Sequence, residues 1–309
     1  MHHPSTSTAG SEPLVSVILP SYGMGKFVRQ ALESIGSQTY GNWEVILVDD
    51  CGPEDGTREA LQEFQEKHPT RRVQYLSNEK NVGCGESRNV AMRAANGEYY
   101  AFLDPDDCWA PEYLVDGMQC MSSKDLCIQG VMITDGAGVD QGPRMESRMN
   151  NLIGAFPTSL MDENFLLPSA TLIHRRVIMA VGEFKNREAL IYAADWDFYL
   201  RCVAAGMRFG FLRKHNCRYR KHDEAATNNY LRMMGECVKL LRMNWKSSAG
   251  WMKKSLRASL HVHLCRLVYL KISLRDWSGL KELEEAFLLD AWNLGPAKSL
   301  IKALKNNWS

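Results

Sequence analysis

Features that would place the chain in several common protein classes are absent from its 309 residues. Its nine cysteines include no CxxC pair, and an odd number without metal-ligand spacing argues for reduced thiols in a cytoplasmic protein and against a disulfide framework. The absence of any run of 18 or more apolar residues argues against a membrane-spanning helix. The polar segment 1–13 lacks the apolar core of a signal peptide, and we expect it to be a disordered lead-in.

Glycine-rich phosphate-binding loops of two common kinds are also missing. No GxGxxG follows the first predicted strand and no GxxxxGKS/T occurs, so dinucleotide-binding Rossmann and P-loop interpretations fail. A nucleotidyltransferase on a similar sheet would need a basic glycine-rich loop at this place, where PSYGMGK supplies only Lys26. We expect no nucleic-acid partner.

The small net charge of +1 is distributed unevenly along the chain. Residues 226–309 carry 14 Lys and Arg against 6 Asp and Glu, whereas residues 1–225 are acidic. Near residue 225 the hydrophobic pattern also changes, from alternating strands and helices to helices alone. We therefore predict one domain over 14–225 and a helical, basic C-terminal region over 226–309 whose charge suggests an anionic partner.

Strand-like and helix-like segments alternate with short connections in the predicted domain. Short apolar runs typical of buried strands lie at 14–19, 43–50, 73–76 and 99–103. Segments with apolar residues at helical spacing lie at 26–37, 55–68 and 86–95. This alternation predicts an α/β fold with a Rossmann-like, mostly parallel sheet flanked by helices. Residues 136–165 show no clear periodicity, and we predict a long surface loop there.

Polar segments follow three of the predicted strands: Pro20–Tyr22, Asp49–Asp50 and Asp104–Asp107. Because ligands of open α/β sheets bind at the carboxyl ends of the strands, we expect these segments to converge on one edge. Clustered carboxylates such as those of the DPDD sequence can hold Mg²⁺ or Mn²⁺, which prefer oxygen ligands. The alternative is that DPDD is a turn in which an acid caps the following element.

Two long blocks carry a family resemblance: VSVILPSYGMGKFVRQALESIGSQTYGNWEVILVDD and NVGCGESRNVAMRAANGEYYAFLDPDD. With VGEF, ADWDFYLRCVAAG and YRKH in this order, they resemble the nucleotide-sugar half of the family 2 glycosyltransferases of the GT-A fold, over about residues 14–225. The chain departs from the family pattern at Gly23, where Asn is usual, and at Ala194, where Glu often precedes the Asp. The first departure loosens the expected loop beneath the nucleotide, and the second removes an acidic neighbour of the expected base.

The resemblance implies site roles position by position. Pro20, Tyr22 and Asp50 match positions that bind the uracil and ribose of a UDP-sugar. The segment that passes the nucleotide contains Asn81, Gly83 and Arg88. Asp104 and Asp106 match the DxD pair, with Asp106 as the direct ligand of Mn²⁺ or Mg²⁺ and Asp104 near the ribose or the metal. His222 matches a histidine that approaches the metal and the diphosphate. Taken singly, Tyr22, Arg88 and His222 also fit an ordinary loop aromatic, a solvated helix residue and a surface histidine.

Two acids in ADWDFYLRC are candidates for the catalytic base. Asp195 and Asp197 lie about 200° apart around a helix, so they cannot both face one cleft. Asp197 has Arg201 four residues further on, the spacing of a side-chain ion pair. The resemblance places the base at the acid just before Trp196. We therefore predict Asp195 as the base, with a helix N-cap as the alternative role.

These features predict an inverting, metal-dependent glycosyltransferase that moves a sugar from a nucleotide donor to an acceptor hydroxyl. The resemblance implies a UDP-sugar as the donor and a cell-surface glycan, or its lipid-linked precursor, as the acceptor. The alternative is a non-catalytic sugar-nucleotide-binding or scaffold protein of the same fold. Such a protein would bind UDP with metal but would not consume a UDP-sugar.

The segment 226–275 contains ten Lys and Arg and one acid, Glu236, interleaved with residues such as Trp251 and Leu256. A basic amphipathic helix can lie on an anionic leaflet, which would place a cytoplasmic protein peripherally at the inner face of the membrane. The alternative is that the leucines pack on the catalytic domain while the basic residues are solvated.

Overall fold

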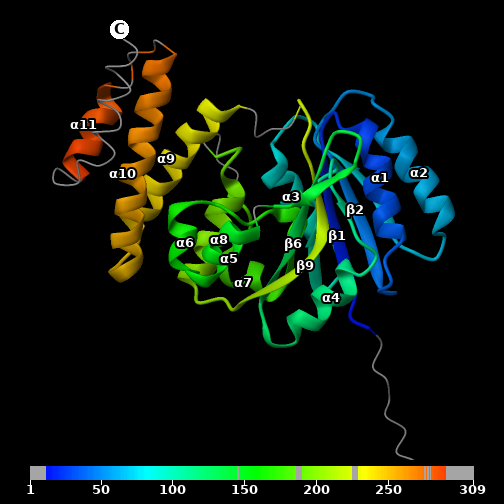
Figure 1. The fold of residues 1–309 in the computed structure, drawn as a ribbon. Helices are drawn as coiled ribbons and strands as arrows, with labels where there is room; N and C mark the ends of the chain where they lie inside the picture. Colours follow the sequence, from blue (N-terminus) through cyan, green and yellow to red (C-terminus); the bar gives the residue numbers. More distant parts are fainter. Residues whose placement is uncertain are drawn as a thin grey trace, which may run out of the picture.

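A nine-stranded sheet with helices on both faces forms the body of the protein (Figure 1). The computed structural model describes residues 12–144, 146–185, 190–224, 229–274, 276, 278 and 280–289. Its strands follow the order β3-β2-β1-β4-β8-β6-β9-β5, with β7 paired to β6. The predicted α/β fold with a helix-flanked sheet is confirmed.

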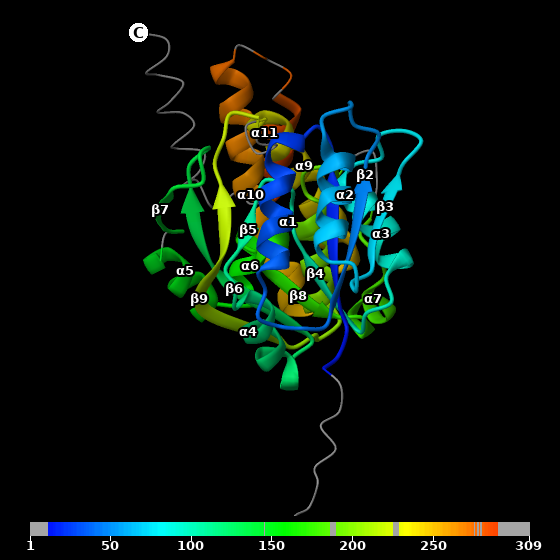
Figure 2. The ribbon, with the colours of Figure 1, turned by 90° about the vertical axis from the view of Figure 1, so that its right-hand side faces the viewer.

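The first four strands are β1 (Val15–Ser21), β2 (Trp43–Asp49), β3 (Val73–Ser77) and β4 (Tyr99–Phe102). All pairings among them are parallel, as the alternating pattern predicts. Their connections are α1 (Gly25–Gly36), α2 (Thr57–Lys67) and α3 (Cys84–Ala94). Alternate residues of β1 face opposite sides of the sheet: Val17 packs with α1 and α2, and Ile18 with α3. Figure 2 looks onto the face that α1 and α2 cover.

The other half of the sheet is mixed rather than mostly parallel. It contains β5 (Cys108–Trp109), β6 (Leu126–Thr134), β7 (Asp140–Pro143), β8 (Thr171–His174) and β9 (Phe209–Arg220). Strand β8 is antiparallel to both of its neighbours, β4 and β6. The pairs β5–β9 and β6–β7 are also antiparallel. Strands β6 and β9 are parallel. The helices of this half that lie before residue 225 are α4 (Tyr113–Cys120), α5 (Glu146–Gly154), α6 (Thr158–Asp162), α7 (Arg176–Val181) and α8 (Ala194–Ala204).

The predicted surface loop at 136–165 is wrong, because β7, α5 and α6 occupy most of it. Both helices are short, so neither produces a long periodic pattern. Met149, Leu152 and Ile153 nevertheless have the i, i+3, i+4 spacing of one helix face, and all three pack against the core.

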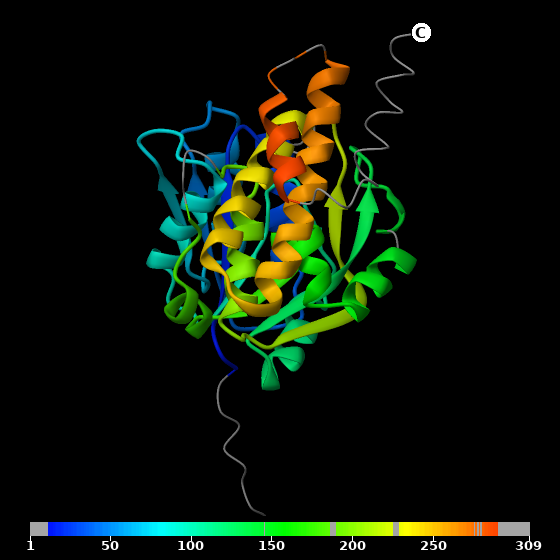
Figure 3. The same ribbon diagram turned by 90° about the vertical axis from the view of Figure 1, so that its left-hand side faces the viewer.

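The C-terminal region is helical, with α9 (Tyr230–Ser247), α10 (Gly250–Ser273) and α11 (Leu280–Leu289). These helices lie on the side of the sheet opposite α1 and α2, where α10 packs against α6 (Figure 3). Leu241 and Leu260 belong to the same buried cluster as Trp196 of α8, so their packing role is confirmed. No helix within the described ranges combines the length and apolar character needed to span a bilayer. The boundary near residue 225 stays a prediction.

Candidate active site

Loops at the carboxyl ends of β1 and β2 form one side of the candidate site. Pro20 lies within β1 beside Val48 of β2, and Tyr22 follows with 52% of its surface exposed. The turn after Tyr22 leads into α1 at Gly25, where a Cβ would lie 1.9 Å from the backbone oxygen of Asp55. This close approach admits only glycine and holds the loop in place.

Asp50 is buried and holds the loop that precedes α3. Its Oδ1 accepts hydrogen bonds from the amide of Asn78 at 2.8 Å and from the backbone N–H of Val82 at 2.9 Å. Its Oδ2 accepts from the backbone N–H of Gly83 at 2.7 Å, where φ is +86°. Asn81, in the same loop, is exposed. Sequence reasoning missed Asn78, although it directly follows the third strand.

The DPDD sequence forms a turn as well as a carboxylate cluster. The backbone N–H of Asp107 donates to the backbone oxygen of Asp104 at 3.1 Å, and the carboxylate of Asp107 accepts from the backbone N–H of Arg220 at 3.0 Å. Burial, then the charges of Asp106 and Asp104, raise the pKa of Asp107 well above its ordinary value. Asp107 therefore has the structural role that the turn interpretation predicts. The side chains of Asp104 and Asp106 are partly exposed to solvent.

Asp106 and His222 meet at this edge of the sheet. His222 Nε2 and Asp106 Oδ2 are 2.9 Å apart, and the His222 ring lies 4.7 Å from that of Phe27. Burial and the charge of Asp104 raise the pKa of Asp106. Arg220, which sequence reasoning missed, donates from Nε to the backbone oxygen of Asp106 at 2.9 Å and stacks over Phe27.

Arg88 pairs with Asp104 of the carboxylate cluster and lies near enough to Asp195 of α8 for the two charges to interact. Its guanidinium is buried and forms a hydrogen-bonded ion pair with Asp104. Burial alone would lower the pKa of Arg88, but the charges of Asp104, Cys84 and Asp195 and the hydrogen bond to Asp104 together raise the pKa above its ordinary value. Within the described part of the chain, the buried Nε of Arg88 has no hydrogen-bond partner. This geometry leaves one donor of a cation available to an anionic group.

The residues present fit a divalent cation, although the described ranges contain no group of three or more His, Cys, Asp or Glu side chains arranged to hold one. Asp106 and His222 offer an oxygen and a nitrogen side by side. Mg²⁺ at nucleotide sites is commonly held by one or two carboxylates together with the phosphates of the substrate, so a full protein cage is not required.

Asp195 and Asp197 occupy different faces of α8, as predicted. Asp197 is fully buried, accepts from Arg201 Nε at 2.7 Å and so has the predicted ion-pair role. Asp195 is partly exposed, with Oδ1 accepting from the backbone N–H of Trp196 at 2.8 Å and Oδ2 from the amide of Asn164 at 2.9 Å. Burial raises the pKa of Asp195, while the nearby charge of Arg88 opposes this.

The Glycosyl transferase family 2 model matches residues 16–182, more than half of the chain. The chain belongs to this family of glycosyltransferases. It is 36% identical over 264 residues to "Putative colanic acid biosynthesis glycosyl transferase WcaA" of Escherichia coli, covering 77% of this chain and 92% of that protein. It is 37% identical over 134 residues to "Putative teichuronic acid biosynthesis glycosyltransferase TuaG" of Bacillus subtilis, covering 42% of this chain and 52% of that one.

Solved GT-A structures share the fold of this glycosyltransferase. Mannosyltransferase PcManGT from Pyrobaculum calidifontis, in complex with GDP-Man and Mn²⁺, has a TM-score of 0.62 at 17% identity, covering 96% of this chain and 87% of that chain. S. aureus TarS in complex with UDP-GlcNAc has a TM-score of 0.59 at 17% identity, covering 88% and 91%. The predicted family, GT-A fold and enzyme class are thus confirmed, and the individual site roles stay predictions.

Proposed function

We propose that this glycosyltransferase moves a sugar from a UDP-sugar to an acceptor hydroxyl with inversion at the anomeric carbon, in cell-surface polysaccharide synthesis. One observation carries the proposal: Asp106, His222 and the Arg88–Asp104 pair gather at the strand ends, with Asp195 close enough for its charge to act on Arg88. A donor diphosphate needs metal ligands and a cation, and an attacking hydroxyl needs a carboxylate that accepts its proton. Sugar transfer requires both close together.

On the donor side, the exposed ring of Tyr22 offers a stacking face for the uracil, and the remaining acceptor capacity of Asp50 suits a base N–H. In this proposal Gly83 and Asn81, in the loop held by Asp50, would lie beside the nucleotide. Asp106 and His222 would hold Mn²⁺ or Mg²⁺, which would supply positive charge for the departing diphosphate. The free Nε–H of Arg88 suits a phosphate oxygen.

On the acceptor side, Asp195 would take the proton of the hydroxyl as that oxygen attacks the anomeric carbon. Its two oxygens each accept one hydrogen bond and keep lone pairs for the incoming O–H. The raised pKa makes the carboxylate a stronger base than an exposed aspartate. The acceptor would be a growing glycan or a lipid-linked precursor.

We also propose a peripheral membrane contact for α10. Trp251 and Tyr269 are exposed, and Lys254 and Arg266 are exposed at positions that fall on the same stripe of the helix. Aromatic and basic side chains together suit the headgroup region of an anionic leaflet. The buried leucines of α10 contribute to the core instead.

The decisive experiment incubates the purified protein with a panel of UDP- and GDP-sugars, with Mn²⁺ or with a chelator. Release of UDP from one UDP-sugar, lost in the chelator, is the expected result. Asp197→Asn serves as a matched control for Asp195→Asn, since both change one acid of the same helix. Binding of UDP with no consumption of any sugar donor would favour a non-catalytic binding protein.

A further inference from the structure

Two cysteine side chains meet where α4 packs on the sheet. Cys120 is the last residue of α4 and is partly exposed, and Cys127 is the second residue of β6 and is buried. Strands β6 and β9 run in the same direction as β4, because β8 is antiparallel to both β4 and β6. The start of β6 therefore lies at the amino ends of these strands, at the edge opposite Asp106 and His222, which follow the carboxyl ends of β4 and β9.

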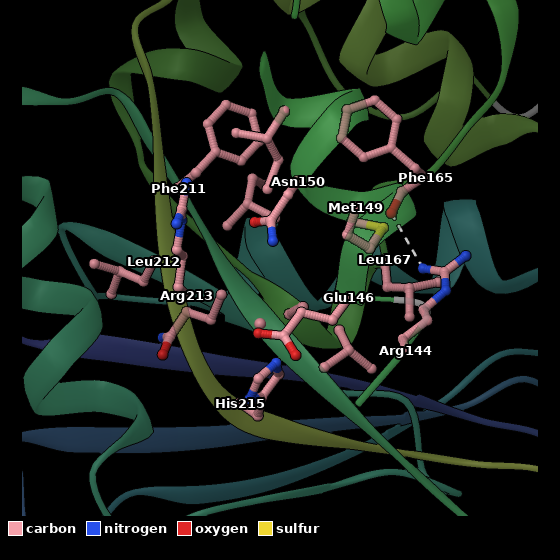
Figure 4. Close-up of a pocket in the computed structure, with 16 residues that line it drawn as sticks. Arg144, Glu146, Met149, Asn150, Phe165, Leu167, Phe211, Leu212, Arg213 and His215 are labelled. Atoms are coloured by element: carbon pink, nitrogen blue, oxygen red, sulfur yellow. Dashed lines mark hydrogen bonds between the residues drawn. The ribbon is translucent and has the colours of Figure 1, made fainter. Parts of the chain in front are cut away.

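Gly210 makes room for the contact between the two cysteines. It is paired with Cys127 across the parallel strands β6 and β9, so both residues face the same side of the sheet. The next residue, Phe211, faces the other side and lines a small pocket beside α5 (Figure 4). A Cβ at Gly210 would collide with Sγ of Cys120. The Cys120 sulfur thus occupies the space in which a side chain beside Cys127 would otherwise lie.

A hydrogen bond between the two thiols makes them chemically different. The thiol of Cys127 donates to the sulfur of Cys120. This bond, helped by the charge of Lys124 and opposed by burial, lowers the pKa of Cys120 to about 7. The same bond, together with burial, raises the pKa of Cys127. Because the thiolate is the nucleophilic form of cysteine, Cys120 has the character of an attacking thiol and Cys127 that of its partner.

Most of the other cysteines have the opposite character. Burial raises their pKa and so favours the unreactive thiol form in Cys84, Cys108, Cys202, Cys217, Cys237 and Cys265.

We propose that Cys120 and Cys127 form a redox-active pair that hydrogen peroxide converts into a disulfide. The Cys120 thiolate attacks one oxygen of the peroxide, the O–O bond breaks, and the departing hydroxide takes up a proton and becomes water. The sulfur of Cys127 then attacks the sulfenic acid on Cys120, and a second water leaves as the S–S bond forms. In sum, two thiols and one hydrogen peroxide give one disulfide and two water molecules.

The pair protects Cys120 from irreversible oxidation. A sulfenic acid without a neighbouring thiol can be oxidised further to sulfinic and sulfonic acids, whereas a disulfide is restored by thiol–disulfide exchange with a reductant. Oxidation also joins the end of α4 covalently to β6. This modification site shares no residue with the proposed donor and acceptor sites and does not rest on the proposed activity.

The test treats the purified, fully reduced chain with a small molar excess of hydrogen peroxide, blocks the remaining thiols with N-ethylmaleimide and maps the tryptic peptides without reduction. Lys124 lies between the two cysteines, so trypsin separates them and a disulfide holds the two peptides together. The linked peptides should appear in most of the oxidised chains and should separate after treatment with dithiothreitol. Cys120→Ser should abolish the link. Cys108→Ser is the matched control, since Cys108 lies in the same tryptic peptide as Cys120, and it should keep the link.

The proposal is wrong if peroxide produces no link between these peptides, if the link persists in Cys120→Ser or if it is lost in Cys108→Ser. Dimedone, which traps sulfenic acids, should label Cys120 in peroxide-treated Cys127→Ser, because the partner thiol is then missing. Absence of that label would contradict the role of Cys120 as the attacking thiol. Thermal unfolding midpoints measured before oxidation identify a variant that has lost its fold, and an alanine at the same position then replaces the serine.

Discussion

Replacing each acid of α8 by asparagine separates catalysis from stability. Asp195→Asn removes the proposed base but keeps an oxygen that accepts from the N–H of Trp196. It loses the hydrogen bond from Asn164, whose own oxygen is already occupied by the backbone N–H of Leu166 at 3.2 Å. One lost hydrogen bond lowers the free energy of unfolding by about 1 kcal/mol. Loss of a general base lowers the transfer rate by at least ~100-fold, which corresponds to about 2.7 kcal/mol of transition-state stabilisation.

Asp197→Asn should show the opposite pattern. Asp197 is fully buried, and removing its charge leaves Arg201 without its counter-ion. Breaking a buried pair costs about 3–5 kcal/mol, and we expect the lower end because Arg201 also donates to the backbone oxygens of Val181 and Glu183. The protein that remains folded should transfer sugar at nearly the parent rate.

The measurements are initial rates of transfer, calorimetric UDP affinity and urea unfolding, all made on the same preparations of both variants. UDP affinity should be unchanged in Asp195→Asn. Transfer that survives in Asp195→Asn and collapses in folded Asp197→Asn would show that the base is on the other face of the helix.

Three more predictions concern acidity, metal and lipid. Burial raises the pKa of Asp195 above 3.8, and only the ionised carboxylate can accept a proton. The rate of transfer should therefore fall as the pH drops through this raised pKa. The pH–rate profile should show the fall at a higher pH than that at which an exposed aspartate titrates. In Asp106→Ala, calorimetry should find that Mn²⁺ no longer strengthens UDP binding; an unchanged metal effect would remove Asp106 from the metal site. Liposome flotation should recover the protein with anionic but not neutral vesicles, and Trp251→Ala with Lys254→Glu should reduce recovery; equal recovery from both kinds of vesicle would exclude an electrostatic contact.

The elements recognisable from sequence are those whose pattern is local. β1, β2 and β4 are short apolar runs buried on both faces, so composition alone identifies them. The Asp197–Arg201 pair followed from spacing on one helix, which needs no knowledge of the rest of the fold.

Features that depend on distant partners were not predictable in this way. β9 carries charged residues such as Arg213 and Lys214 and shows no continuous apolar run, because much of its length is only partly buried. Its place beside β6 rests on a pairing across about 80 residues, which no local period reveals. For the same reason the anchoring of the DPDD turn by Arg220, and of the loop before α3 by Asp50, could only be found in the structure.

Arg220 is the last residue of β9 and forms hydrogen bonds to three segments that lie far before it in the sequence. Its backbone and side chain bond to Asp107 and Asp106, and its guanidinium reaches Gln30 and Gly136. A chain that ends before β9 would thus contain Asp104, Asp106 and Asp107 but would lack Arg220, which holds the turn that carries Asp106. We therefore expect a protein truncated before β9 to bind UDP at the proposed donor site more weakly than the full chain does, because the turn that carries Asp106 is no longer held by Arg220.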